Sequence, residues 1–269
     1  MNRFVMSVAA ALISVTAVGS GSLPPGRPAE ASTRLAPSHQ AETGSLLLVG
    51  GGDLPETVRQ RFLELAGGRE ARIVLIPSAS ALPEAADRAR ALWQSAAVKS
   101  VQVLHATSRR EADDPGFAGL LRDATGVWIS GGDQSRLAAL YDGTAVERGL
   151  RDLLLRGGVV AGTSAGASIV TDVMMADGGK ASKGLGLLDH TVVDQHFSNR
   201  GRLPRLLALL RSHPGQAGIG IDQETAVLIH GGEVSVLGNA TVTVADPTVH
   251  VYRAGSHFQY APVLTVASR

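Results

Sequence analysis

The sequence predicts an α/β fold, in which a doubly wound and mostly parallel sheet is covered by helices on both faces. From residue 45 onwards, short runs of Val, Ile and Leu alternate with longer amphipathic stretches. Strands of parallel sheets have this uniformly apolar character because both of their faces are buried. Hydrophobic residues make up 44% of the 269 residues and charged residues 18%, which is enough for the core of one large domain. Glycine clusters at several junctions suit tight turns between strands and helices.

The elements follow in order along the chain. Apolar runs predict strands at residues 46–49, 73–76, 101–104, 127–129 and 159–161. Amphipathic stretches predict helices at residues 55–66, 83–97, 117–123 and 144–156. We then expect a strand at 191–193, a leucine-rich helix after it, and a strand at 218–222. The tail holds closely spaced strand patterns separated by Gly or Asp-Pro turns, which predict a β-rich, antiparallel C-terminal edge: residues 227–229, 234–237, 241–244 and 249–252.

The N-terminal segment has the pattern of a secretory signal. A short basic start, Met1-Asn2-Arg3, precedes an apolar run of small residues at 4–19, and Ala29-Glu30-Ala31 offers a cleavage site. The run is short for a bilayer span, so we expect no stable membrane anchor. The predicted organisation is a signal peptide at 1–31, a flexible lead-in at 32–44 and a single domain at 45–269. The mature protein is therefore expected to be periplasmic or secreted.

Charge and residue content exclude several function classes. The chain has 25 basic and 24 acidic residues, with no block of like charge, which argues against nucleic-acid binding. It contains no cysteine, so thiolate zinc sites and cysteine nucleophiles are excluded. The eight histidines lack metal-binding spacing, and no glycine cluster fits a Walker A loop or a dinucleotide fingerprint. We therefore expect neither a metal nor a cofactor.

The strongest motif is Gly162-Thr163-Ser164-Ala165-Gly166, which joins a buried strand pattern to a run of small residues. It has the form of a nucleophile elbow, a cramped turn where flanking glycines relieve the crowding around an exposed serine. Ser164 is the candidate nucleophile. The N–H of Ala165 is then expected to face the position where an oxyanion would form. The alternative is an ordinary glycine-rich turn.

A candidate base follows the next short strand pattern. Residues 194–197 read Asp194-Gln195-His196-Phe197, and His196 is the natural partner for a serine nucleophile. Three arginines come directly afterwards, at positions 200, 202 and 205. They are either solvated surface residues or a cluster of forked donors that grips a substrate carboxylate.

Taken in order, these pieces resemble the cyanophycinases, serine peptidases with the flavodoxin-like fold of class I glutamine amidotransferases. The matching pieces are Gly131-Gly132-Asp133-Gln134, the elbow, Gly184–Leu188, Asp194–Phe197 with the three arginines, and Gly218–Asp222 with Thr225-Ala226. The resemblance extends from Ser45 to the end of the chain. It implies hydrolysis of cyanophycin, a poly-aspartate chain that carries arginine on its β-carboxyls, to β-Asp-Arg dipeptides by a homodimer.

The same resemblance implies roles for individual residues. Ser164 is the nucleophile and His196 its base, while the N–H groups of Gly132 and Ala165 form the oxyanion hole. Arginines would hold free substrate carboxylates, and Asp194 would meet a substrate guanidinium. The residues that match the substrate pocket are Gln134, Asp194, Gln195, Arg200, Arg202 and Arg205.

The chain departs from the family at the residue expected to orient the base. Gln223 stands where cyanophycinases usually have a glutamate. It follows a predicted strand, and its amide oxygen can accept a hydrogen bond from the imidazole. Glu224 is the alternative, but adjacent residues on extended chain face opposite ways. We therefore predict that Gln223 orients His196 and that the enzyme is slow.

Two other functions remain open at this stage. One is an aspartyl dipeptidase, or another peptidase of the same fold that acts on acidic peptides. The other is a catalytically silent ligand-binding protein, which the departure at Gln223 favours. The presence of both Ser164 and His196 favours an enzyme.

Overall fold

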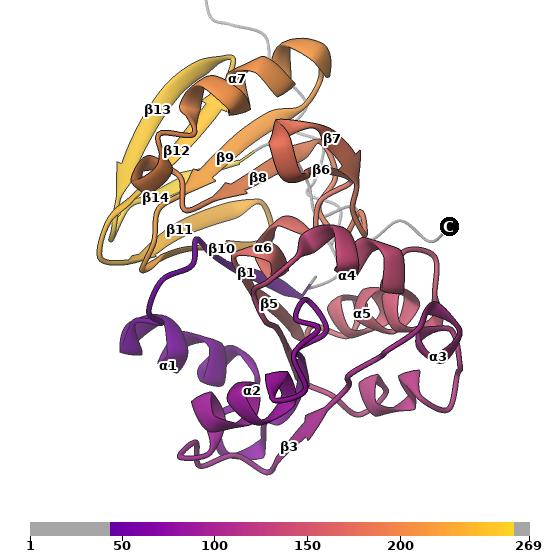
Figure 1. Cartoon of the computed structure of the whole chain (residues 1–269). Helices are drawn as coiled ribbons and strands as arrows, with labels where there is room; N and C mark the ends of the chain where they lie inside the picture. The colour runs from indigo at the N-terminus through magenta and orange to yellow at the C-terminus, as the bar shows by residue number, and fades with distance from the viewer. Residues whose placement is uncertain (1–43, 261–269) are drawn as a thin grey trace, which may run out of the picture. The chain divides into compact units, whose positions relative to one another are not determined.

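A computed structural model describes residues 44–260 (Figure 1). Its main sheet has eight strands in the order β14-β11-β10-β1-β5-β4-β2-β3. Five of them are parallel: β1 (Ser45–Val49), β2 (Arg72–Ile76), β3 (Ser100–Val103), β4 (Gly126–Ile129) and β5 (Val159–Thr163). The other three extend the sheet in antiparallel fashion beyond β1: β10 (Thr225–His230), β11 (Glu233–Gly238) and β14 (His257–Gln259). The mostly parallel α/β fold expected from the sequence is confirmed.

Helices cover both faces of the main sheet because alternate strand residues point to opposite sides. On one face, Leu47 and Val49 pack with α1 (Glu56–Leu65) and α2 (Ala85–Trp93). On the other face, Leu46 and Leu48 belong to a core shared with α4 (Gln134–Tyr141) and α5 (Ala145–Leu155). Figure 1 shows these two helical layers on either side of the strands.

A second sheet of four strands has the order β13-β12-β9-β8. The parallel pair β8 (Thr191–Gln195) and β9 (Ala217–Ile221) is extended by the antiparallel strands β12 (Thr241–Asp246) and β13 (Thr248–Arg253). Its Ile219, Ile221, Val242 and Val244 join the core on the α4–α5 side of the main sheet, and α7 (Leu203–Ser212) packs on β9. The short strands β6 (Val173–Met175) and β7 (Ala181–Lys183) form a separate hairpin.

Several elements differ from the expectation, and the short strands β6, β7 and β14 were not expected at all. The strand patterns of the tail do not form one edge, because β10 and β11 join the main sheet while β12 and β13 join the second. Residues 117–123 contain only a 3₁₀ helix, Ala118–Leu121, since Gly119 lies at its centre and glycine disfavours longer helix. Two helices join those expected: α3 (Arg109–Ala112), capped by Ser108, and α4, whose N-cap Asp133 accepts hydrogen bonds from the N–H groups of Ser135 and Arg136.

The expectations for the N-terminus concern residues 1–43, which lie outside the described part of the chain. Within residues 44–260, no helix has both the length and the apolar character that crossing a bilayer requires.

Candidate active site

Ser164 lies where β5 meets the short helix α6 (Ala165–Ser168), with φ at 52°. Close backbone packing enforces this turn. A Cβ atom at position 162 would lie 2.1 Å from the carbonyl oxygen of Gly166, and a Cβ atom at position 166 would lie 2.2 Å from that of Ile129. The two glycines of the motif are therefore the residues that allow the strand and the helix to approach each other.

His196 follows β8 and faces the serine across the junction between the two sheets. Its Nε2 lies 2.9 Å from Ser164 Oγ, and its backbone N–H donates to the carbonyl of Gly50. A Cβ atom at position 51 would lie 2.2 Å from Cε1 of the imidazole. The glycine turn after β1, Gly50-Gly51-Gly52, thus makes room for His196. This role was not predicted from the sequence.

Burial has a direct consequence for the base. It holds the pKa of His196 below its ordinary value, and the positive charges of Arg200 and Arg202 lower this pKa further. The negative charge of Asp194 acts in the opposite direction. The imidazole is therefore neutral at pH 7, which is the state in which it can take a proton.

Gln223 lies in the three-residue link between β9 and β10 and contacts the far side of the imidazole. Its Nε2 is 2.8 Å from His196 Nδ1, and its backbone N–H donates to Asn199 Oδ1. Glu224 is directed elsewhere, with φ at 55° and its Oε2 accepting from Asn239. Gln223 and Glu224 thus point in different directions because of a left-handed turn at Glu224, and not because the chain is extended there as the sequence suggested.

The orientation of the Gln223 amide decides the tautomer of His196. When Gln223 Nε2 faces His196 Nδ1, the amide donates a hydrogen bond to Nδ1. The imidazole hydrogen then lies on His196 Nε2. Proton transfer from Ser164 requires the other tautomer, with the hydrogen on Nδ1. If the Gln223 amide is turned over, its oxygen faces His196 Nδ1 and accepts the hydrogen of the reactive tautomer. A carboxylate supports only the second state, because it has no hydrogen to donate.

The first of the two glycines that follow β4 lies close to Ser164, because a Cβ atom at position 131 would lie 3.3 Å from Ser164 Cβ. The second, Gly132, has a φ of 146°, and a Cβ atom there would clash with the carbonyl of Ala79. The N–H of Ala165 is in the first turn of α6, where no intrahelical acceptor exists. Gly131 and Ala165 thus lie next to Ser164, so their amides are candidates for an oxyanion hole. Gly131 is an addition to the sequence-based set of Gly132 and Ala165.

The predicted substrate residues fall into two groups. The first group, Gln134, Asp194 and Gln195, is buried. Gln134 donates to the carbonyl of Met175, Gln195 is buried against Ser168, and Asp194 is fully buried. The Asp194 carboxylate accepts from Arg202 Nη1 at 3.2 Å and from Arg205 Nε at 2.8 Å. Asp194 is therefore already ion-paired with this chain's own arginines, and its contact with a substrate guanidinium stays a prediction.

The arginines differ in how open they are. Side-chain exposure is 13% for Arg202 and 30% for Arg205, which share Asp194, whereas Arg200 is exposed. Because the carboxylate orients two guanidinium groups and leaves part of each accessible, the cluster can bind a substrate carboxylate. Arg200 is the one of the three whose guanidinium makes no hydrogen bond within the described chain.

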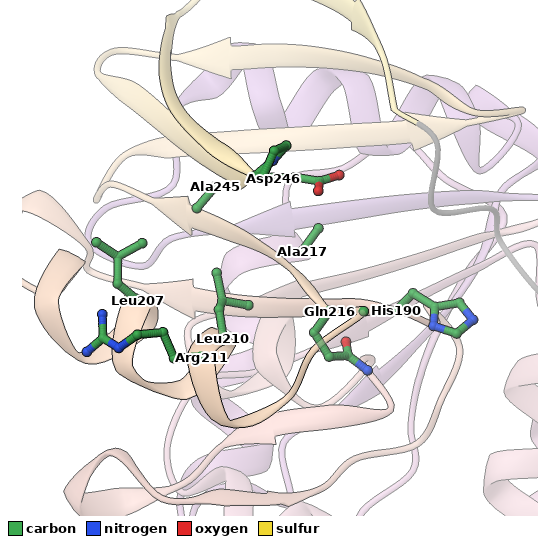
Figure 2. A pocket seen from close by; sticks show the side chains of 10 residues that line it. His190, Leu207, Leu210, Arg211, Gln216, Ala217, Ala245 and Asp246 are labelled. Atoms are coloured by element: carbon green, nitrogen blue, oxygen red, sulfur yellow. The ribbon is translucent and has the colours of Figure 1, made fainter.

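Other features of residues 44–260 do not compete with this site. A cavity of about 600 Å³ lies between α7 and the ends of β9 and β12, next to His190 (Figure 2). His190 precedes β8 and His196 follows it, so this cavity opens at the opposite end of that strand from Ser164. In this part of the chain, no three His, Cys, Asp or Glu side chains gather closely enough to hold a metal ion.

Comparisons with known proteins identify the family of the chain. The profile of peptidase family S51 matches residues 46–237. A cyanophycinase of Synechococcus elongatus is 35% identical over 246 residues, which cover 85% of this chain and 76% of the relative. One from Geminocystis herdmanii is 35% identical over 218 residues, covering 75% and 80%. The crystal structure of a peptidase from an acI-B1 Actinobacterium superposes with a TM-score of 0.70 at 25% identity, covering 82% of this chain and 98% of that one.

Proposed function

The chain belongs to peptidase family S51 and is a serine peptidase related to cyanophycinases, and from that premise we propose that it is an exported exopeptidase that releases β-Asp-Arg dipeptides from cyanophycin. The observation that carries the proposal is the 2.9 Å contact between Ser164 Oγ and His196 Nε2 at a strand-to-helix elbow. The cationic side chains of Arg200, Arg202 and Arg205 supply the recognition of carboxylates that this polymer requires.

The proposed reaction proceeds through an acyl-enzyme. His196 Nε2 takes the proton of Ser164 as Oγ attacks the scissile carbonyl, and the oxyanion is held by the N–H groups near Gly131, Gly132 and Ala165. The imidazolium then gives that proton to the leaving amine, and the peptide bond breaks. A water molecule, deprotonated by His196, hydrolyses the ester and restores Ser164. Gln223 must present its oxygen to Nδ1 during both halves.

Export rests on the N-terminal sequence pattern alone. An extracellular location would suit a polymer released by other cells. N-terminal sequencing of protein from the periplasm or the medium should find a start near Ser32, and a start at Met1 in that fraction would contradict it. The homodimer implied by family resemblance is tested by sedimentation.

The burial of Asp194 favours a second candidate, a peptidase for acidic peptides that do not contain arginine. Its carboxylate is already paired with Arg202 and Arg205, so a substrate guanidinium finds no free partner there. The two functions are separated by incubating the purified protein with cyanophycin and with aspartyl peptides, and identifying the products by mass. β-Asp-Arg from cyanophycin, absent with Ser164→Ala, supports the first function; cleavage of aspartyl peptides alone supports the second.

A further inference from the structure

A cavity of about 260 Å³ lies beside the nucleophile, on the face of the main sheet that α2 covers. It is lined by Thr163, the residue before Ser164, and by Ser130 and Gly131 at the end of β4. Position 131 is the one whose Cβ atom would lie 3.3 Å from Ser164 Cβ. A group bound in this cavity would therefore be adjacent to the reacting atoms.

Most of the exposed wall of the cavity is apolar, although Ser80, Ser130 and Thr163 also line it. Ala85, Ala89 and Leu92 recur at helical spacing and line it from one face of α2, with Trp128 of β4 opposite. Leu92 is 47% exposed, so its side chain is accessible to a group that enters the cavity. The single charged lining residue, Arg88, is paired with Glu84 at 3.0 Å on the exposed surface.

The cavity differs in chemistry from the region around the base. Arg200, Arg202 and Arg205 follow His196 and give that region a positive charge. Around the α2 cavity the charge of Arg88 is offset by Glu84, so its lining favours a neutral group. The volume of the cavity corresponds to about eight water molecules, which is enough for one large side chain.

We propose that this cavity is a specificity subsite for an apolar side chain next to the scissile bond. The inference rests on the proposed function in one respect, the role of Ser164 as nucleophile. It extends the substrate class to peptides that combine a carboxylate, held by the arginines, with a Leu-like or Phe-like residue in the α2 cavity. Cyanophycin contains only aspartate and arginine, so this preference is not one that the polymer would require.

Binding measurements separate this inference from catalysis. Calorimetry with the Ser164→Ala protein should compare aspartyl peptides that carry Leu or Ala, placed first on one side of the scissile bond and then on the other. On one side, the Leu peptide should bind about tenfold more tightly, since the cavity removes an isobutyl group from water. Leu92→Gln should reduce that ratio to about twofold, because it places an amide on the cavity wall.

A matched control uses a leucine of similar exposure. Leu155 is 53% exposed at the end of α5 and does not line the cavity, so Leu155→Gln should leave the ratio unchanged. Equal affinity for Leu and Ala peptides on both sides, or an unchanged ratio in Leu92→Gln, would overturn the subsite while leaving the proposed function intact. Preferential binding without Ser164-dependent cleavage of any peptide or of cyanophycin would instead support the subsite and refute the proposed function.

Discussion

Ser164, the proposed nucleophile, and His196, its proposed base, are held in place by different kinds of interaction. Around Ser164, backbone atoms approach so closely that Gly162 and Gly166 are the residues that fit. Around His196, polar side chains form a network: Asn199 positions Gln223, and Asp194 positions Arg202 and Arg205. Close backbone packing tolerates no added atom, whereas a polar network can be retuned by exchanging one group. This contrast explains how the chain can carry an amide at position 223 and still place the base.

The largest expected effect is on turnover when the nucleophile is removed. Ser164→Ala should lower kcat on the order of 10⁴-fold or more, because the other groups of a serine hydrolase site cannot replace the attacking oxygen. The melting temperature should change little. Ser168→Ala is the control, since Ser168 donates to the carbonyl of Val193 and is buried below the site. That variant should lose stability and keep its activity per folded molecule. A Ser164→Ala protein with a tenth of the wild-type kcat would refute the assignment.

The buried ion pair of the base region gives the next largest effect, on stability. Asp194→Asn leaves two arginines close together without their shared negative charge, and should lower the free energy of unfolding by about 3 kcal/mol. Asp113→Asn breaks the exposed pair with Arg148 and should cost less than about 1 kcal/mol. Urea denaturation of both variants measures the difference. Similar losses in the two would mean that the Asp194 network does not hold the base region together.

Gly51→Ala is expected to impair the base selectively. Its Cβ atom would occupy space taken by the imidazole, and a displacement of about 1 Å costs on the order of 10²-fold in rate. Gly67→Ala is the control. The φ of Gly67 is 103°, similar to the 98° of Gly51, but no atom lies close to it, so this variant has the backbone strain without the clash. Steady-state kinetics should show a fall in kcat for the first variant only. Equal kcat values for the two variants would show that the space next to Gly51 does not fix the position of the His196 imidazole.

The smallest expected effect concerns Gln223. Gln223→Glu fixes the reactive tautomer and should raise kcat about tenfold, while Gln223→Ala should lower it with little change in KM. The pH profile gives a second measure. Activity requires neutral His196, whose pKa is lowered, so the acidic limb of kcat/KM should lie below pH 6.5 in the wild type. A carboxylate at 223 favours the imidazolium, and the limb should move to higher pH. If kcat responds instead to Glu224→Gln, the orienting residue is Glu224.

Much of the fold could be predicted because its signals are local. Uniformly apolar runs placed β1, β2, β4 and β5 within a residue or two, and the elbow motif located Ser164 at the end of β5. Asp133 and the glycines before it were visible as a junction, but α4 after them was not among the expected helices. The division of the tail between two sheets was also missed, since β10 and β12 have similar patterns and differ in the partners they meet.

The sequence by itself predicted the αβ alternation, the nucleophile elbow and His196 as the candidate base, because each prediction depends on neighbouring residues or on the chemistry of a single side chain. Only the tertiary structure decided that Gly51 makes room for the imidazole and that Asp194 pairs with Arg202 and Arg205. The preference for Gln223 over Glu224 was predicted from the sequence, whereas the 2.8 Å distance from Gln223 Nε2 to His196 Nδ1 came from the structure. The contacts of His196 with Gly51 and Gln223 join segments that are far apart in the chain. They depend on how side chains pack, and the pairing of Asp194 depends on which polar groups compete for it. Neither the packing nor this competition can be deduced from the spacing of residues along the sequence.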